Sequence, residues 1–361
     1  MKPYALLLLV LLGGIAFSLT RPSPSFPAQS FHGMADASAV EVLNQDWFVV
    51  ANDEDNLLRI YHRGQTEAPV RSLDLSPFLR AGNKGKKGKS EEVDLEGSAR
   101  VGDTIFWISS HGRNAAGEFA SSRHRLLATK VGAIAGVPWV HPVGDHFTDL
   151  VAELLAEPRF AHLGLAEAAQ RAPKSPGGLN IEGLAATPQG GLLIGFRSPT
   201  PQGQALMVSL LNPMEVIGGT KPRFGDPILL PLDGQGIRGM VNVASGYWIV
   251  AGSSGSGGIS RLFRWNGGSD APELWPGIDL SDLNPEGISV AEGTTGPTLL
   301  LTSDDGTMKV DGREAKRLKD PSKKTFRLAT VVLPGATLPP ESNTSVPSAS
   351  MPLAQLPPGR R

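Results

Sequence analysis

The stretch Asn180-Ile181-Glu182-Gly183-Leu184-Ala185 decides the fold, because its pattern returns along the chain. Full copies stand at residues 94–99 (DLEGSA) and 284–289 (NPEGIS). Two weaker copies keep the frame, at residues 236–241 (GIRGMV), where arginine replaces the glutamate, and at residues 36–39 (DASA). Each copy precedes an apolar or β-prone run. A motif that recurs in phase with predicted strands indicates a repeat architecture.

The chain after each copy reads as a series of short strands. Each strand is about five β-branched, leucine or aromatic residues bounded by Asn, Asp, Gly or Pro. In the first unit the predicted strands are 37–43, 47–51, 57–61 and 70–75. The anchors Asp36, Glu96, Glu182, Arg238 and Glu286 are 60, 86, 56 and 48 residues apart. These steps match propeller blades of about 40–50 residues with loop insertions.

We therefore predict an all-β fold, a β-propeller of five blades. Six blades is the alternative, if the 86-residue step hides a degenerate blade. A pair of β-sandwiches gives no reason for one motif to recur in phase with the strands. Residues 147–171 switch to helical periodicity, and we read them as a helical insertion that replaces or follows the outer strand of the second unit.

The N-terminus predicts an exported protein. Residues 1–18 combine Lys2, an apolar run and small residues near Ser18, which is typical of a secretory signal peptide. An uncleaved membrane anchor is the alternative, although the run is short for a spanning helix. We expect a linker over residues 19–32, the propeller over 33–333 and a disordered Pro/Ser-rich tail over 334–361. The predicted location is the periplasm or the extracellular medium.

Composition limits the partners. The net charge is -1, which gives no general attraction for nucleic acid or an anionic membrane. The lysine-rich stretch 82–90 reads as a solvated surface loop. The chain has no cysteine, so an exported form has no disulfide and must depend on a large core. We expect a monomer that binds no nucleic acid and no membrane beyond the signal segment.

Propeller geometry brings distant residues to one end of the central axis, which we call the mouth. The inner strand of each blade starts there, and the second strand ends there. Glu96, Glu182 and Glu286 would repel one another around this axis unless they are compensated. Calcium could compensate them, with Asn180 and Asn284 as carbonyl ligands. Pairing with Arg197 and Arg238 is the alternative, and the Glu-Gly pair could also serve only to cap the strand and let blades approach.

A second group of polar residues follows the second strands. His111, after the apolar run 105–108, could transfer protons, and Arg113 could hold an anion with two hydrogen bonds. The alternative is that both residues tie their turn to a neighbouring loop. Residues of the predicted mouth assigned to substrate contacts are Arg113, Arg197, Arg238, Asp53, Ser303 and Asp304. Those assigned to catalysis are Glu182, His111 and Glu96.

The segments 94–129, 180–213 and 284–307 resemble the domain of unknown function 3616 family of bacterial proteins. The resemblance covers roughly Gly33 to Leu333 and implies no established activity. The Glu-Gly strand start is also similar to exported propellers of the esterase-like phytase and gluconolactonase groups. In those groups axial acids hold calcium or act on phosphate esters or lactones. Arg238, in place of an acid, departs from a wholly carboxylate metal cage.

Two functions remain open from the sequence. The first is a metal-assisted hydrolase of small anionic esters, phosphate esters or lactones. The second is a non-catalytic periplasmic propeller that binds a ligand or a protein. A catalytic mouth needs desolvated acids with shifted pKa values and a metal or base within reach, whereas a binding platform does not.

Overall fold

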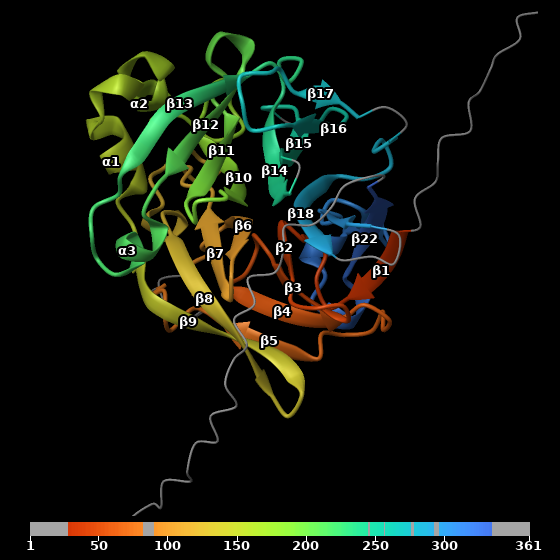
Figure 1. Ribbon diagram of the computed structural model, residues 1–361. Helices are drawn as coiled ribbons and strands as arrows, with labels where there is room; N and C mark the ends of the chain where they lie inside the picture. The colour runs from red at the N-terminus through yellow and green to blue at the C-terminus, as the bar shows by residue number, and fades with distance from the viewer. Residues whose placement is uncertain are drawn as a thin grey trace, which may run out of the picture.

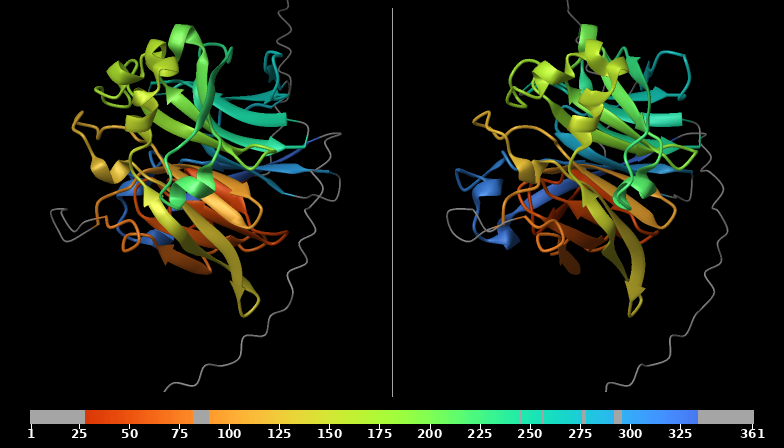
Figure 2. Two further views of the ribbon diagram at one scale, coloured as in Figure 1. Left: turned by 60° about the vertical axis from the view of Figure 1, so that its left-hand side comes forward. Right: turned by 90° about the vertical axis from the view of Figure 1, so that its left-hand side faces the viewer.

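The computed structural model describes residues 28–81, 90–244, 246–255, 257–275, 278–291 and 296–333. In this part of the chain, five four-stranded antiparallel sheets surround a central axis as the blades of a propeller (Figures 1 and 2). The predicted all-β class and the blade number of five are confirmed. In the described part of the chain, the 86-residue step between Glu96 and Glu182 contains no sixth blade.

The first four blades are each built from consecutive strands. Blade one consists of β2 (Ala39–Val42), β3 (Trp47–Ala51), β4 (Leu57–His62) and β5 (Arg71–Asp74). Blade two consists of β6 (Leu95–Val101), β7 (Thr104–Ser109), β8 (Leu126–Ile134) and β9 (Val137–Phe147). Blade three consists of β10 (Asn180–Ala186), β11 (Leu192–Ser198), β12 (Ala205–Leu210) and β13 (Phe224–Leu230). Blade four consists of β14 (Gly236–Val243), β15 (Gly246–Gly252), β16 (Arg261–Trp265) and β17 (Glu273–Leu274).

Blade five joins the two ends of the described chain. Its strands are β18 (Pro285–Ala291), β19 (Thr298–Ser303), β22 (Thr325–Val332) and, outermost, β1 (Ala28–His32). Strand β1 pairs with β22 from Ala28↔Ala329 to His32↔Thr325. Phe31 of β1 is fully buried and lies 5.1 Å from Phe48 of blade one and 5.5 Å from Phe326, between ring centroids.

The prediction of a linker over 19–32 is therefore wrong for residues 28–32. The segment before Phe31 is rich in Pro and Ser, which favoured a linker. Blade five has three strands of its own in sequence, so the edge of β22 needs a partner, and β1 supplies it. Buried Phe31, together with the hydrogen bond from the Tyr61 hydroxyl to the His32 oxygen at 3.0 Å, then joins the N-terminal strand to blade one.

The predicted helical insertion follows the outer strand of blade two rather than replacing it. It consists of α1 (Leu150–Ala156), η2 (Pro158–Leu163) and α2 (Leu165–Ala168), which start directly after β9. Leu150 and Leu154 are buried in the core shared by blades two and three. Figure 1 shows these helices and α3 (Pro213–Ile217) at the outer side of blade three. The insertion thus adds a helical layer outside the blades. It accounts for the long step between the anchors Glu96 and Glu182.

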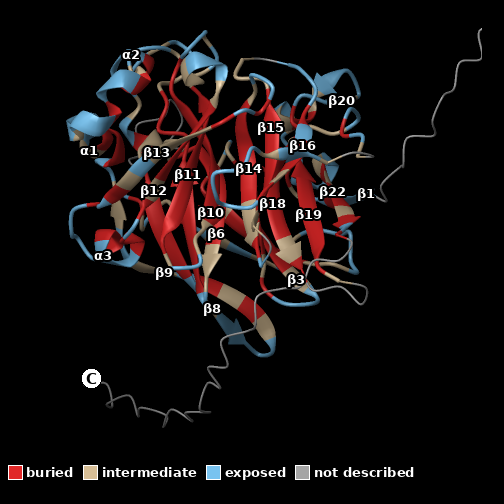
Figure 3. Ribbon diagram, turned by 45° about the horizontal axis from the view of Figure 1, so that its top comes forward, coloured by how far each residue is buried: buried red, intermediate tan, exposed pale blue. Residues whose placement is uncertain are grey.

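A ring of buried strands surrounds the axis, with exposed loops and helices outside it (Figure 3). The buried apolar residues form clusters between neighbouring blades, such as the one that joins blades one and two through Val49, Trp107 and Leu127. The remaining elements are short and lie in the connections between strands. They are η1 (Ser121–Arg123), η3 (Pro201–Gly203), β20 (Lys309–Val310), β21 (Arg313–Glu314), η4 (Ala315–Arg317) and η5 (Pro321–Lys323).

Glycine in the Glu-Gly motif lets the inner strands approach each other. A Cβ on Gly97 would lie 2.9 Å from the backbone oxygen of Glu182 in the next blade. A Cβ on Gly239 would lie 2.1 Å from the backbone oxygen of Glu286. Such contacts are with backbone, which cannot swing aside. The structure therefore agrees with the packing role that the sequence left open for these glycines.

The predicted signal peptide (1–18), the tail (334–361) and most of the lysine-rich loop (82–89) lie outside the described residues. Within the described residues, no helix has both the length and the apolar character that crossing a membrane requires.

We expect Gly239→Ala to destabilise the protein by about 3 kcal/mol, because the new methyl group overpacks the junction of blades four and five. Urea unfolding followed by tryptophan fluorescence measures the change. Gly132→Ala is the matched control, since a Cβ at Gly132 meets no atom within 4 Å. Equal stability of the two variants would contradict the close-approach explanation.

Candidate functional site

A β-bulge at the start of each of four inner strands sends one ionisable side chain to the axis. In blade two, Leu95 pairs with Ser109 and Gly97 pairs with Ile108, so Glu96 has no partner across the ladder. The same register shift leaves Glu182, Arg238 and Glu286 without a cross-strand partner in the other three blades. A bulge of this kind re-aims a side chain and is frequent beside functional sites. The repeated motif is therefore a repeated bulge.

The cavity on the axis is small. It is lined by Ser38, which takes the bulge position in blade one, and by Glu96, Glu182 and Glu286. The cavity volume is about 10 Å³, which is room for about one water molecule. Side chains thus close the axis, and chemistry with a larger molecule must occur at the mouth above it.

Two arginines neutralise one side of the mouth. Arg238 donates to Asn284 Oδ1 at 2.6 Å, to Glu182 Oε2 at 3.4 Å and to Glu286. Arg197 donates to Glu182 Oε1 at 2.6 Å and to the backbone oxygens of Ser253 and Gly255. Both arginine side chains are buried. The buried ion network that the sequence offered as an alternative to calcium is therefore present on this side.

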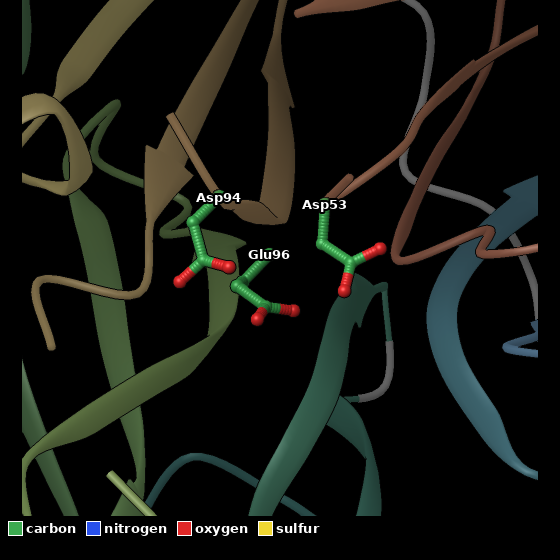
Figure 4. A group of neighbouring side chains, drawn as sticks. All are labelled: Asp53, Asp94 and Glu96. Atoms are coloured by element: carbon green, nitrogen blue, oxygen red, sulfur yellow. The ribbon is translucent and has the colours of Figure 1, made fainter. Parts of the chain in front are cut away.

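The opposite side of the mouth is acidic. Asp53, which follows β3, and Asp94 and Glu96, at the start of β6, each place a carboxylate oxygen within 4.8 Å of the other two (Figure 4). Asp94 is held by Ser110 and by Arg123, whose Nη1 lies 2.9 Å from Asp94 Oδ2. Among the described residues, no hydrogen bond or ion pair reaches Glu96, and Asp53 Oδ1 is buried without a partner.

Burial and mutual repulsion shift the pKa values of these acids. Burial, followed by the charge of Asp94, raises the pKa of Glu96 well above its usual range. Burial, followed by the charge of Asp304, does the same to the pKa of Asp53. Burial also raises the pKa of Asp94, although Arg123 opposes this change. Burial and mutual repulsion both oppose the ionised forms of these carboxyl groups, so the acidic side has a deficit of positive charge.

Asp36 and Asp304 extend the acidic side toward blade five. The two residues form an isolated antiparallel bridge, and Asp36 is 2% exposed. Burial, followed by the charge of Asp304, raises the pKa of Asp36 to about 8. Asp304 accepts from Asn284 Nδ2 at 3.1 Å and from the Gly306 amide at 3.0 Å. The Asp304 carboxylate is thus held within the protein, while Asp36 Oδ2 is buried without a partner.

His111 lies in a left-handed turn and is fixed away from these acids. Its Nδ1 is 2.8 Å from the backbone oxygen of Ser109, and its ring packs on His124 at 5.4 Å. Burial, followed by His124, lowers the pKa of His111 to about 3. The imidazole is therefore neutral at pH 7, and its Nε2 is buried without a partner. The structure does not join His111 to the carboxylates of the mouth.

Arg113 ties its loop to the helical insertion. Its guanidinium donates to the backbone oxygens of Ala169 and Gly117 at 2.9 and 3.1 Å, and to Gln170 Oε1 at 2.6 Å. This is the alternative that the sequence left open for the residue. Its donors are used by the chain itself.

The remaining predicted residues also bond within the protein. Ser303 Oγ donates to Asp305 Oδ1 at 2.8 Å and accepts from the Asn284 amide at 3.0 Å. Asn180 Nδ2 donates to Glu182 Oε1 at 2.7 Å, and its Oδ1 is buried without a partner. The five residues proposed as metal ligands thus divide. Glu182, Glu286 and Asn284 contact arginine, Asn180 contacts Glu182, and Glu96 joins the other acids.

Sequence reasoning did not find Lys316 or Glu54. Lys316 Nζ lies 2.9 Å from Glu54 Oε1, although 262 positions separate the two residues. Glu54 follows Asp53 in the mouth loop of blade one, whereas Lys316 belongs to η4 in a long connection of blade five. The motif carries no signal for this pair, because the connection has no counterpart in the other blades.

Comparison with known proteins supports the family resemblance. Residues 144–275 match the model of the family described as Protein of unknown function (DUF3616). The resemblance expected from the sequence is confirmed over this part of the chain, from β9 to just beyond β17. No curated protein matches the sequence.

Solved propeller structures resemble the chain only in outline. A putative oxidoreductase (glucose dehydrogenase) of Thermus thermophilus is 14% identical, with 85% of this chain and 100% of that chain covered and a TM-score of 0.40. The PQQ-bound aldose sugar dehydrogenase of Streptomyces coelicolor is 12% identical, with 85% and 99% covered and a TM-score of 0.40. The glutaminyl cyclase of Myxococcus xanthus is 12% identical, with 85% and 97% covered and a TM-score of 0.40. Similarity at this level says nothing about what this chain binds or does.

In a chelating buffer, the protein should lose stability as the pH rises from 5 to 8. Asp36 keeps its proton in the folded state up to a pKa of about 8 but loses it near pH 4 when unfolded. The folded state therefore holds more protons in this range, and each such group lowers the free energy of unfolding by about 1.4 kcal/mol per pH unit. Asp36→Asn imitates the protonated form and should flatten this slope, as measured by urea unfolding at several pH values.

The exposed Asp46→Asn serves as the control and should keep the slope of the parent protein. An unchanged slope in Asp36→Asn would contradict the assignment of this proton to Asp36.

Proposed function

We propose that the protein binds a divalent cation at the mouth, with Asp53, Asp94 and Glu96 as carboxylate ligands. One observation carries the proposal: three carboxylate oxygens converge within 4.8 Å, and among the described residues no cationic side chain contacts Asp53 or Glu96. Buried carboxylates must be paired, protonated or bound to a metal. Arginines pair with Glu182 and Glu286 on the other side of the mouth, whereas on the acidic side Arg123 pairs with Asp94 alone of the three ligands.

The donor set fits calcium. Calcium takes oxygen ligands at 2.3–2.6 Å, so two oxygens that bind one ion are at most about 5 Å apart. The spacing of the three carboxylates satisfies this limit. The set contains no thiol and no imidazole, the ligands that favour zinc or copper. Waters or a ligand would complete the coordination shell.

For the reaction, we propose hydrolysis of a small anionic ester, phosphate ester or lactone. A bound cation would supply a Lewis acid that polarises the scissile group and lowers the pKa of a bound water. Asp94 is fixed by Ser110 and Arg123, which suits a ligand that stays ionised. Glu96 accepts no hydrogen bond among the described residues, so its carboxylate could serve either as a ligand of the cation or as the acid/base. Arg238 and Arg197 hold Glu182 and Glu286 in place around it.

A non-catalytic binding propeller is the second candidate, and a specific observation favours it. The arginines assigned to anion binding, Arg113, Arg197 and Arg238, all donate to groups of the chain itself. His111 is not joined to the carboxylates. Under this alternative the cation and the mouth loops hold a ligand without turnover.

Calcium should raise the melting temperature of the parent protein in a thermal unfolding assay. At a concentration about 100 times the Kd, the stabilisation is about 2.7 kcal/mol. Glu96→Gln removes one charged ligand and should abolish most of this gain. Glu41→Gln is the matched control, because Glu41 is also a buried carboxyl group but lies outside the three ligands and bonds to Ser289.

A melting temperature that calcium leaves unchanged in all three proteins, together with no metal in the purified protein, would overturn the cation site.

Turnover separates the two candidate functions. We expect the calcium-loaded protein to hydrolyse a member of a phosphomonoester and lactone panel, and Glu96→Gln to lose at least about a hundred-fold in kcat. Glu41→Gln should keep the parent rate. Calcium binding without turnover on any member of the panel would favour the binding propeller.

A further inference from the structure

Lys316 places its ammonium group at the outer edge of the acidic side of the mouth. The connection between β19 and β22 carries β20, β21 and η4, and Lys316 lies in η4. Its Nζ donates to Glu54 Oε1 at 2.9 Å, so an ion pair joins blade five to the mouth loop of blade one. The Lys316 side chain is 29% exposed, which leaves it in contact with water at the rim.

The connection that carries Lys316 is held firmly against the acids. The Lys316 amide donates to the Gly306 oxygen at 3.0 Å, and the Lys324 ammonium donates to the Lys316 oxygen at 2.8 Å. Gly306 in turn packs on the Asp36 carboxylate so closely that a Cβ there would lie 1.6 Å from Asp36 Oδ1. The backbone of the connection therefore has a fixed position beside the mouth.

Lys316 acts electrostatically on more than its direct partner. Besides Glu54, the acids that act on it are Asp36 and Asp53, and together they raise the pKa of Lys316 although burial opposes this change. Asp53 is one of the three proposed cation ligands. Among the described lysines, no other forms an ion pair with an acid of the mouth.

We propose that Lys316 is the resident counter-ion of the cation site and sets its affinity for divalent ions. The proposal rests on the cation site of the proposed function. The ammonium pairs with Glu54, next to the ligand Asp53, so it and a divalent cation both act on Asp53, and the two positive charges repel each other. Each therefore weakens the binding of the other to those acids, as linkage requires.

A merely structural role makes a different prediction. If Lys316 only fastens the connection to blade one, then loosening the connection by other means has the same effect on calcium binding. Lys324 offers that comparison, because its ammonium fastens the same connection through a backbone oxygen. Lys324 does not pair with an acid of the mouth among the described ion pairs.

Calcium titration by calorimetry tests the proposal in the parent protein, Lys316→Met and Lys324→Met. Methionine keeps much of the length of the side chain and removes the charge. We expect Lys316→Met to bind calcium about ten-fold more tightly or better, and Lys324→Met to bind with the parent affinity. In chelator, Lys316→Met should melt at a lower temperature than the parent protein, and saturating calcium should close this gap.

The outcomes separate this proposal from the one on which it rests. If the parent protein and Lys316→Met bind calcium with equal affinity, the cation site stands and the role of Lys316 is overturned. If Lys324→Met tightens binding as much as Lys316→Met, the effect belongs to the connection, and the role of the charge is likewise overturned. If none of the proteins binds calcium, both proposals fail.

Discussion

The fold places four ionisable side chains and one serine around an axis that has room for about one water molecule. This follows from the bulge at the start of four of the inner strands. The residue without a cross-strand partner, such as Glu96, points at the axis, and the glycine after it packs against the neighbouring blade. Like charges at such distances repel strongly where water is scarce. The negative charges at the mouth must therefore be compensated for the ring of blades to close, and the groups that compensate them differ from blade to blade.

The balance is met in two different ways. Around Glu182 and Glu286 the counter-charge comes from the chain, through Arg238 at a bulge position and Arg197 at the end of a second strand. Around Asp53 and Glu96 the nearest compensation is indirect, through Arg123 on Asp94 and Lys316 on Glu54. The acids in one half of the mouth are therefore paired with arginine, and those in the other half lack a direct cationic partner except for Asp94. The buried ion network holds its side chains in place, whereas Asp53 and Glu96 in the other half keep negative charge that no side chain in contact with them neutralises among the described residues.

Much of the fold could be predicted because it follows from local patterns. The Glu-Gly copies and the runs after them mark the inner and second strands, and the alternation of turns and strands gives five blades. Strand β1 could not be recognised in this way, because its pairing with β22 joins residues about 300 positions apart and its sequence is rich in Pro and Ser nearby. The mouth residues were found by topology, but the pairing of Arg197 and Arg238 with the glutamates was only one of the alternatives that the sequence left open. Whether Arg197 turns to a substrate or to Glu182 depends on side-chain distances that no motif records.

Arg238 shows what the departure from the repeat achieves. With a glutamate at that bulge, four acids would surround the axis, and each would need a proton or a cation. The arginine instead contacts Glu182, Glu286 and Asn284 from three elements and so removes half of the ring from any metal site. In the proposed cation site the ion would thereby be restricted to the side of blades one and two, where Asp53, Asp94 and Glu96 converge. Arg238 and Ser38, the two departures from glutamate at the bulge positions, thus make the charge around the axis uneven, and the proposed cation site lies off the axis, on the side of blades one and two.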